Sequence, residues 1–223
     1  METPLNGPDV GPPTLERIRR APKVLLHDHL DGGLRPSTII ELADETGYAD
    51  IPTADADELA AWMLRGANRK DLTLYLETFA HTVGVMQTAP AIERVARECA
   101  EDLAADGVVY AEIRFAPELH TERGLSLDAV IEAVITGFEA GSSGTDLTIR
   151  IICSAMRHLD RGLEVAQAAV RHRDHGVVGF DIAGPEDGFP PDAHLLAFQY
   201  CQRENFHVTI HAGEAYGPRS IWK

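Results

Sequence analysis

Five short runs of apolar, mostly β-branched residues recur along the chain, and they predict buried strands. The runs cover residues 24–30, 108–116, 147–155, 177–183 and 207–211. Because their apolar residues are nearly continuous and do not alternate with polar ones, we expect strands that are covered on both faces. Such strands are typical of a parallel sheet in an α/β domain.

Segments with helical spacing separate these strands. In residues 91–105 and 127–140, apolar residues recur three and four positions apart and charged residues fill the gaps. The last four strands begin about 40, 30 and 30 residues apart, which is near the length of one βα unit. The alternation predicts helical crossovers between parallel strands.

The gap between the first two strands is longer than the others. It contains segments 36–46, 55–65 and 72–86, in which we expect two or three extra helices over one mouth of a barrel. Periodicity does not separate a barrel from a doubly wound sheet, but the adjacent Gly32 and Gly33 lack the spacing of a dinucleotide-binding loop. We therefore expect an incomplete (β/α)8 TIM barrel with about five of eight strands, a helical insertion after strand 1, and a barrel region at residues 21–223.

Composition narrows the possible settings. The chain has 223 residues and a formal net charge of −15, which disfavours nucleic acid and membrane surfaces as partners. Its three cysteines form no C-x-x-C pair, which fits a reducing, cytoplasmic location. Residues 1–20 are expected to be a flexible leader, since the Pro- and Gly-rich start lacks the features of a secretory signal. The sequence predicts no oligomeric state.

The strongest chemical signal is His27-Asp28-His29-Leu30-Asp31 at the end of the first strand. Residues two apart face the same side of a strand, so His27, His29 and Asp31 should project together. Two imidazoles so placed can bind one metal ion, although H-x-H can also arise by chance in a chain with ten histidines. The end of a barrel strand is where catalytic side chains gather.

A second signal, His211-Ala212-Gly213-Glu214, ends the fifth strand. His211 would add a third nitrogen ligand, giving a set that Zn²⁺ accepts while it keeps an open position for water. Gly213 would turn the chain so that Glu214 lies beside that water, as a buried carboxyl that delivers a proton. The alternative is that Glu214 is a solvated loop residue.

Two further residues have open interpretations. Asp181 lies inside an apolar strand and needs a partner, so it either supports the site or lies near it. Gly184 either lets a flat ligand lie against the backbone or is a turn glycine before Pro185. The remaining histidines are interpreted as surface or packing residues: His81, His120, His158, His172, His175, His194 and His207.

Four motifs in this chain resemble the adenosine deaminase family of amidohydrolase barrels. They are residues 27–33 (HDHLDGG), 109–117 (VYAEIRFAP), 181–184 (DIAG) and 209–214 (TIHAGE). The resemblance implies that His27, His29 and His211 bind one zinc ion and that Glu214 donates a proton to purine N1. It further implies that His29 and Asp31 lie against the substrate, with Asp31 on the ribose, and that Gly184 contacts the purine edge.

The reaction implied by the resemblance is hydrolytic deamination of adenosine and deoxyadenosine to inosine and ammonia, in purine salvage. The chain lacks the H-x-E and P-C-x-x-C signature of the cytidine deaminase type. It also has no lysine in residues 177–184, which disfavours a two-metal amidohydrolase. Related purine or adenine deaminases and a catalytically inactive zinc-binding fragment remain alternatives. Because the family's later His and Asp pair have no counterpart here, we expect little or no deaminase activity from the chain alone.

Overall fold

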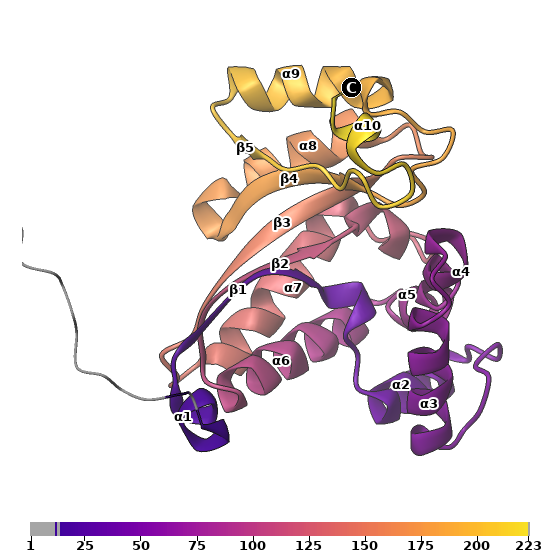
Figure 1. Cartoon of the computed structure of the whole chain (residues 1–223), viewed down its shortest axis with the longest axis vertical. Helices are drawn as coiled ribbons and strands as arrows, with labels where there is room; N and C mark the ends of the chain where they lie inside the picture. The colour runs from indigo at the N-terminus through magenta and orange to yellow at the C-terminus, as the bar shows by residue number, and fades with distance from the viewer. Residues whose placement is uncertain (1–11, 13, 223) are drawn as a thin grey trace, which may run out of the picture.

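Five parallel strands form one curved sheet in a computed structural model that describes residue 12 and residues 14–222 (Figure 1). The sheet follows the order of the sequence: β1 (Lys23–His29), β2 (Val108–Phe115), β3 (Thr148–Met156), β4 (Val177–Ala183) and β5 (His207–Val208). A doubly wound sheet reverses its strand order at a switch point, whereas a (β/α)8 barrel does not. The strand order therefore confirms the predicted α/β class, with five strands arranged as in part of a (β/α)8 barrel.

The fifth strand is shorter than the predicted 207–211, because only two of its residues complete a ladder with β4. The backbone nevertheless continues along β4. The amide of Thr209 donates to Phe180 at 2.9 Å, and that of His211 donates to Ile182 at 3.1 Å. This continuation carries His211 to the same end of the sheet as the ends of the other strands.

The two edges of the sheet expose apolar side chains. On β1, Val24 and Leu26 are 60% and 55% exposed, and beyond β5 Ile210 is 44% exposed. Such exposure is expected of an open sheet, whose first and last strands each lack one neighbour.

Helices cover the outer side of the sheet (Figure 1). They are α6 (Ala89–Ala105), α7 (Leu127–Ser142), α8 (Gly162–Arg171) and α9 (Leu195–Arg203). Helices α6 and α7 approach so closely that a Cβ at Gly137 would lie 2.3 Å from the carbonyl oxygen of Glu93. The shorter elements are α1 (Leu15–Arg20), α10 (Pro218–Ile221), η1 (Leu30–Gly32), η2 (Pro117–His120), η3 (Arg173–His175) and η4 (Pro191–His194).

The insertion after β1 folds into four helices, where the sequence predicts two or three: α2 (Pro36–Thr46), α3 (Ala56–Ala67), α4 (Leu72–Leu76) and α5 (Phe79–Val85). The predicted helix 72–86 divides at Thr78, whose hydroxyl donates to the Tyr75 carbonyl at 2.7 Å. A local bond of this kind competes with helical bonding. Helix α5 contacts η1 and η2, which follow β1 and β2, so the insertion lies over the carboxyl ends of the strands as expected.

Most of the predicted leader 1–20 lies outside the described residues. Its final part is helical, because α1 spans Leu15–Arg20 and Thr14 caps it by accepting the amide of Arg17 at 3.3 Å. Across residues 14–222, no helix combines the length and the apolar character needed to cross a membrane.

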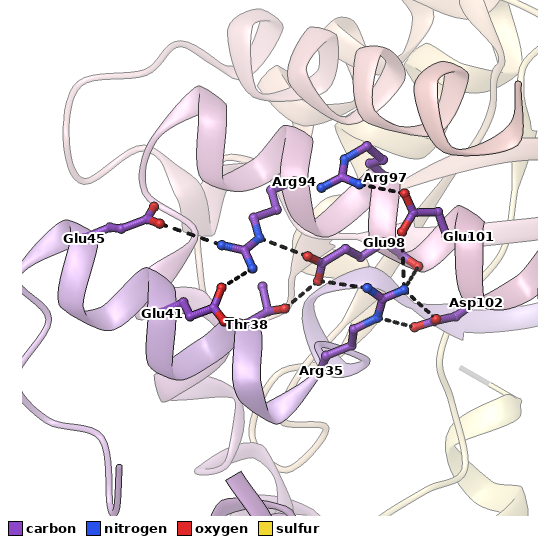
Figure 2. A network of polar contacts seen from close by, with 9 residues as sticks. All are labelled: Arg35, Thr38, Glu41, Glu45, Arg94, Arg97, Glu98, Glu101 and Asp102. Atoms are coloured by element: carbon purple, nitrogen blue, oxygen red, sulfur yellow. Dashed lines mark hydrogen bonds and ion pairs between the residues drawn. The ribbon is translucent and has the colours of Figure 1, made fainter. Parts of the chain in front are cut away.

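An ion-pair network joins the insertion to the body of the domain, between α2 and α6 (Figure 2). At its centre Glu98 has only 8% of its side chain exposed. It accepts hydrogen bonds from Arg94 at 2.9 Å and from Thr38 at 2.5 Å, and Arg35 lies 3.9 Å away. The remaining members are more exposed: Glu41, Glu45, Arg97, Glu101 and Asp102.

Glu98→Ala should lower the free energy of unfolding by about 2–3 kcal/mol, because it leaves Thr38 and two guanidinium groups without their buried acceptor. Urea denaturation followed by circular dichroism measures this change. Glu45→Ala is the matched control, since Glu45 pairs with Arg94 at 3.7 Å with 63% of its side chain exposed. Glu45→Ala should lower the free energy of unfolding by less than about 0.5 kcal/mol. Equal costs for the two variants would contradict a central role for Glu98.

Candidate active site

Three imidazoles meet at the carboxyl end of the sheet. The Nε2 atom of His211 lies 3.0 Å from Nε2 of His27 and 3.1 Å from Nε2 of His29. Together they form a group whose ligand atoms all lie within 4.8 Å of one another and that can hold a metal ion. The structure thus brings together residues from opposite edges of the sheet, 184 positions apart in the sequence.

The part of β1 that contains His27 carries a β-bulge. Leu25 pairs with Ala111 and Asp28 pairs with Ile113, so β1 carries one extra residue over this interval. A bulge of this kind redirects side chains and increases local twist. The predicted convergence of His27 and His29 is therefore achieved with a bulge, in place of the simple alternation assumed from the sequence.

Asp181 is the partner that fixes the orientation of His211. Its Oδ2 atom lies 2.8 Å from Nδ1 of His211, and the carboxylate accepts hydrogen bonds from Ser154 at 3.0 Å and Thr209 at 3.1 Å. Burial alone would raise the pKa of Asp181, but the His211 bond and the nearby Arg114 charge outweigh it and lower that pKa. An ionised Asp181 keeps the proton of His211 on Nδ1 and leaves Nε2 with a free lone pair.

The geometry of the imidazoles fits a metal better than mutual hydrogen bonds. Neutral Nε2 atoms with lone pairs repel at 3.0 Å unless a cation lies between them. Four-coordinate Zn²⁺ with nitrogen ligands at its usual bond lengths separates those nitrogens by about 3.3 Å. Burial, reinforced by the imidazoles of His211 and His27, lowers the pKa of His29 to about 4, so this ring is neutral at neutral pH.

A cavity of about 410 Å³ opens beside the imidazoles. His29, Asp31, Gly184, His211 and Glu214 line it, and its volume is in the range of small-molecule sites. The sequence-predicted site residues that line this cavity therefore come from β1, from η1, from the residue after β4 and from the segment after β5.

Asp31 lies in η1 and is almost fully buried at the cavity wall. Its Oδ2 atom accepts the amide of Ala116 at 3.3 Å, while Oδ1 is buried without a hydrogen-bond partner among the described residues. Burial raises the pKa of Asp31 to about 6. An unpartnered oxygen beside a cavity is ready to accept a hydrogen bond from a ligand.

Glu214 departs from the sequence-based expectation of a buried carboxyl, because its side chain is exposed. It follows the edge segment of the sheet and lines the cavity. Gly184 has a φ of +93°, and a Cβ there would lie 2.7 Å from Met156 Cε. The positive φ favours glycine at this position in the cavity wall.

Sequence reasoning missed the apolar wall of the cavity, which α4 and α5 supply through Tyr75, Leu76, Phe79 and Val83. It also missed Arg114, which is 4% exposed on β2 and donates to Asp181 at 3.3 Å and to the Leu26 carbonyl at 3.2 Å. A signal for Arg114 was present, since a charged residue within an apolar strand needs a buried counter-charge elsewhere in the interior.

The other histidines lie outside this group. His120 and His194 are buried packing residues that face the carbonyl oxygens of Met86 and Arg157 at 3.1 and 3.3 Å. His158 is exposed and lines the cavity, so it is closer to the site than the sequence suggested.

Known proteins align with nearly the whole length of this chain. A family model described as adenosine deaminase matches residues 22–223. Adenosine deaminase 1 of Streptomyces coelicolor is 61% identical over 216 residues, which are 95% of this chain and 54% of that protein. The adenosine deaminase of Mycolicibacterium gilvum is 61% identical over 215 residues, 94% of this chain and 59% of that protein. The chain thus spans little more than half the length of these relatives.

Solved structures agree with this grouping. The N6-mAMP deaminase of Arabidopsis superposes with a TM-score of 0.80 at 29% identity, over 93% of this chain and 64% of that one. The adenine deaminase of Arthrobacter aurescens superposes with a TM-score of 0.77 at 27% identity, over 90% of this chain and 60% of that one. An amidohydrolase of Burkholderia ambifaria, solved with bound Zn, superposes with a TM-score of 0.74 at 25% identity, over 95% of this chain and 58% of that one. The four motifs follow the strands of the sheet in sequence order, and the family match covers the whole sheet. This chain therefore belongs to the adenosine deaminase family.

Proposed function

We propose that this site serves the zinc-dependent hydrolytic deamination of adenosine and deoxyadenosine to inosine and ammonia, as a step of purine salvage. The observation that carries the proposal is the convergence of three imidazoles beside a cavity that Glu214 also lines. Metal ligands and a proton-donating carboxyl on one cavity are what hydrolysis of an amidine-like C–N bond requires.

One zinc ion per chain would be held by His27, His29 and His211. When bound, zinc lowers the pKa of a water molecule toward neutrality and so supplies the nucleophile. The Burkholderia relative with bound Zn supports this choice of metal. Asp181 contributes by fixing the His211 tautomer through the 2.8 Å contact to Nδ1.

The chain's own residues have separate roles toward the purine nucleoside. Glu214 delivers a proton to N1 of the ring, and Gly184 lets the edge of the purine approach the backbone. Asp31 accepts a hydrogen bond from the ribose through its unpartnered Oδ1 atom, while His29 lies against the substrate from the metal side. The apolar wall of α4 and α5 excludes water from the reacting ring.

A neutral nucleoside is favoured over a nucleotide. The cavity lining contains neither Lys nor Arg, so it offers no cationic side chain to a phosphate group. We extend the proposal to a reducing, cytoplasmic setting, which the free thiols of Cys99, Cys153 and Cys201 support.

Glu214→Gln should reduce the conversion of adenosine to inosine by at least about 100-fold, because the amide does not deliver the proton that N1 needs. Chromatography of inosine formed by the zinc-loaded chain at high protein concentration measures the rate, and the comparison is informative even at low turnover. Glu204→Gln changes a carboxylate at the C-terminal cap of α9, outside the cavity lining, and should leave the rate unchanged. Conversion that is no faster in the unsubstituted chain than in Glu214→Gln would refute the proposal.

Asp181→Asn should weaken Zn²⁺ binding by about 10- to 100-fold, because a neutral amide holds the Nδ1 proton of His211 less strongly than a carboxylate does. Competition with a chromophoric chelator measures the dissociation constant, and circular dichroism checks that the variant is folded. Asp160→Asn removes an exposed carboxylate from the loop after β3 and should leave the affinity unchanged. An unchanged affinity in Asp181→Asn would show that His211 does not depend on this carboxylate.

A further inference from the structure

The segment that carries Glu214 has its own anchor. Three backbone amides of the turn after His211 converge on the carboxylate of Glu186, which follows β4. Gly213 donates to Oε1 at 2.8 Å, while Ala215 and Tyr216 donate to Oε2 at 2.7 and 3.2 Å. The amides that hold the carboxylate thus flank Glu214 on both sides.

The backbone of this turn is shaped to bind an anion. Gly213 and Gly217 have φ values of +89° and +61°, and such left-handed positions point successive N–H groups inward to form a nest. In this chain the anion is a side chain, since Glu186 is 6% exposed within the turn. Burial opposes its ionisation, but the hydroxyl of Ser220 and the turn amides outweigh burial and lower the pKa of Glu186 to about 2.

His211 is held by different contacts. Its amide donates to Ile182 at 3.1 Å, its carbonyl accepts Arg157 at 2.5 Å, and its ring faces Asp181. None of these contacts involves Glu186. The metal-binding imidazole is therefore held by β4 and by Arg157 after β3, whereas the amides on either side of Glu214 are held by Glu186 after β4.

We propose that Glu186 is a positioning residue that locks the Gly213–Tyr216 turn and so keeps Glu214 directed into the cavity. The role of Glu214 as the proton donor rests on the proposed function. A glutamine at position 186 keeps the size of the side chain, but its NH₂ group faces amide donors and accepts none of them. An aspartate keeps the charge and both acceptor oxygens on a shorter stem.

Amide hydrogen exchange of the chain, read by mass spectrometry on a peptide covering residues 212–217, tests the lock directly. In Glu186→Gln these amides should exchange at least about 10-fold faster, because charge-assisted hydrogen bonds protect them. Peptides from β1 to β4 should exchange as before. In Glu186→Asp, the exchange rate of residues 212–217 should lie between the rates in the unsubstituted chain and in Glu186→Gln.

Asp187→Asn is the matched control. Asp187 is the next residue and touches the same turn, but it does so through the Tyr216 hydroxyl and not through the backbone amides. Its substitution should leave exchange of residues 212–217 within about 2-fold of the original, since the nest around Glu186 is intact.

Two further measurements separate positioning of Glu214 from support of the metal. Glu186→Gln should keep its Zn²⁺ affinity within about 3-fold, because His211 has its own anchors, while kcat for adenosine falls at least about 10-fold and KM changes less. Equal exchange in Glu186→Gln and Asp187→Asn, faster exchange across the whole sheet, or a loss of Zn²⁺ affinity would each overturn the proposal. If the unsubstituted chain converts no adenosine, the proposed function fails, and exchange and Zn²⁺ affinity still decide whether Glu186 holds the turn.

Discussion

The ion pair between Arg114 and Asp181 lies inside the curved sheet, and the arrangement of the site depends on it. Asp181 is fully buried and Arg114 nearly so, with 3.3 Å between them. Either charge alone would be costly in this interior, so each needs the other and further hydrogen bonds. Arg114 reaches the carbonyl of Leu26 on β1 and the hydroxyl of Thr209 after β5, at 3.2 and 3.5 Å. One guanidinium thereby ties both edges of the sheet to its middle.

The curvature of the sheet explains how distant residues form one site. Strands β1 and β5 are at opposite ends of the strand order, yet the imidazoles at their carboxyl ends are in contact. A flat sheet of five strands would separate them by about 19 Å, from the usual spacing of neighbouring strands. Twist and closure toward a barrel bring inward-facing side chains together, and loops at the same end complete the cavity.

Buried carboxylates recur as organising groups in this fold, each with a different kind of partner. Glu98 receives guanidinium and hydroxyl groups and joins the insertion to α6. Asp181 receives an imidazole and orients it toward the metal-binding group. Glu186 receives backbone amides and shapes the turn after β5. In each case the cost of burying a charge is offset by several strong hydrogen bonds, which also restrict the geometry.

Local signals in the sequence determined much of this picture. Apolar runs at βα-unit spacing predicted the five strands, and polar residues at strand ends predicted the two histidine segments, because both depend on near neighbours in the chain. The four motifs together indicated the family. Composition alone predicted a flexible leader at residues 1–20. Residues 1–11 and 13 of that range lie outside the described residues.

Tertiary structure decided the rest. Periodicity does not contain the strand order that distinguishes a barrel from a doubly wound sheet, nor the bulge that redirects His27. The partners of Asp181, the exposure of Glu214 and the division of residues 72–86 into two helices depend on residues that approach only after the sheet has curved and the insertion has packed. Sequence determines which side chains are available, whereas the distances between them follow from long-range packing.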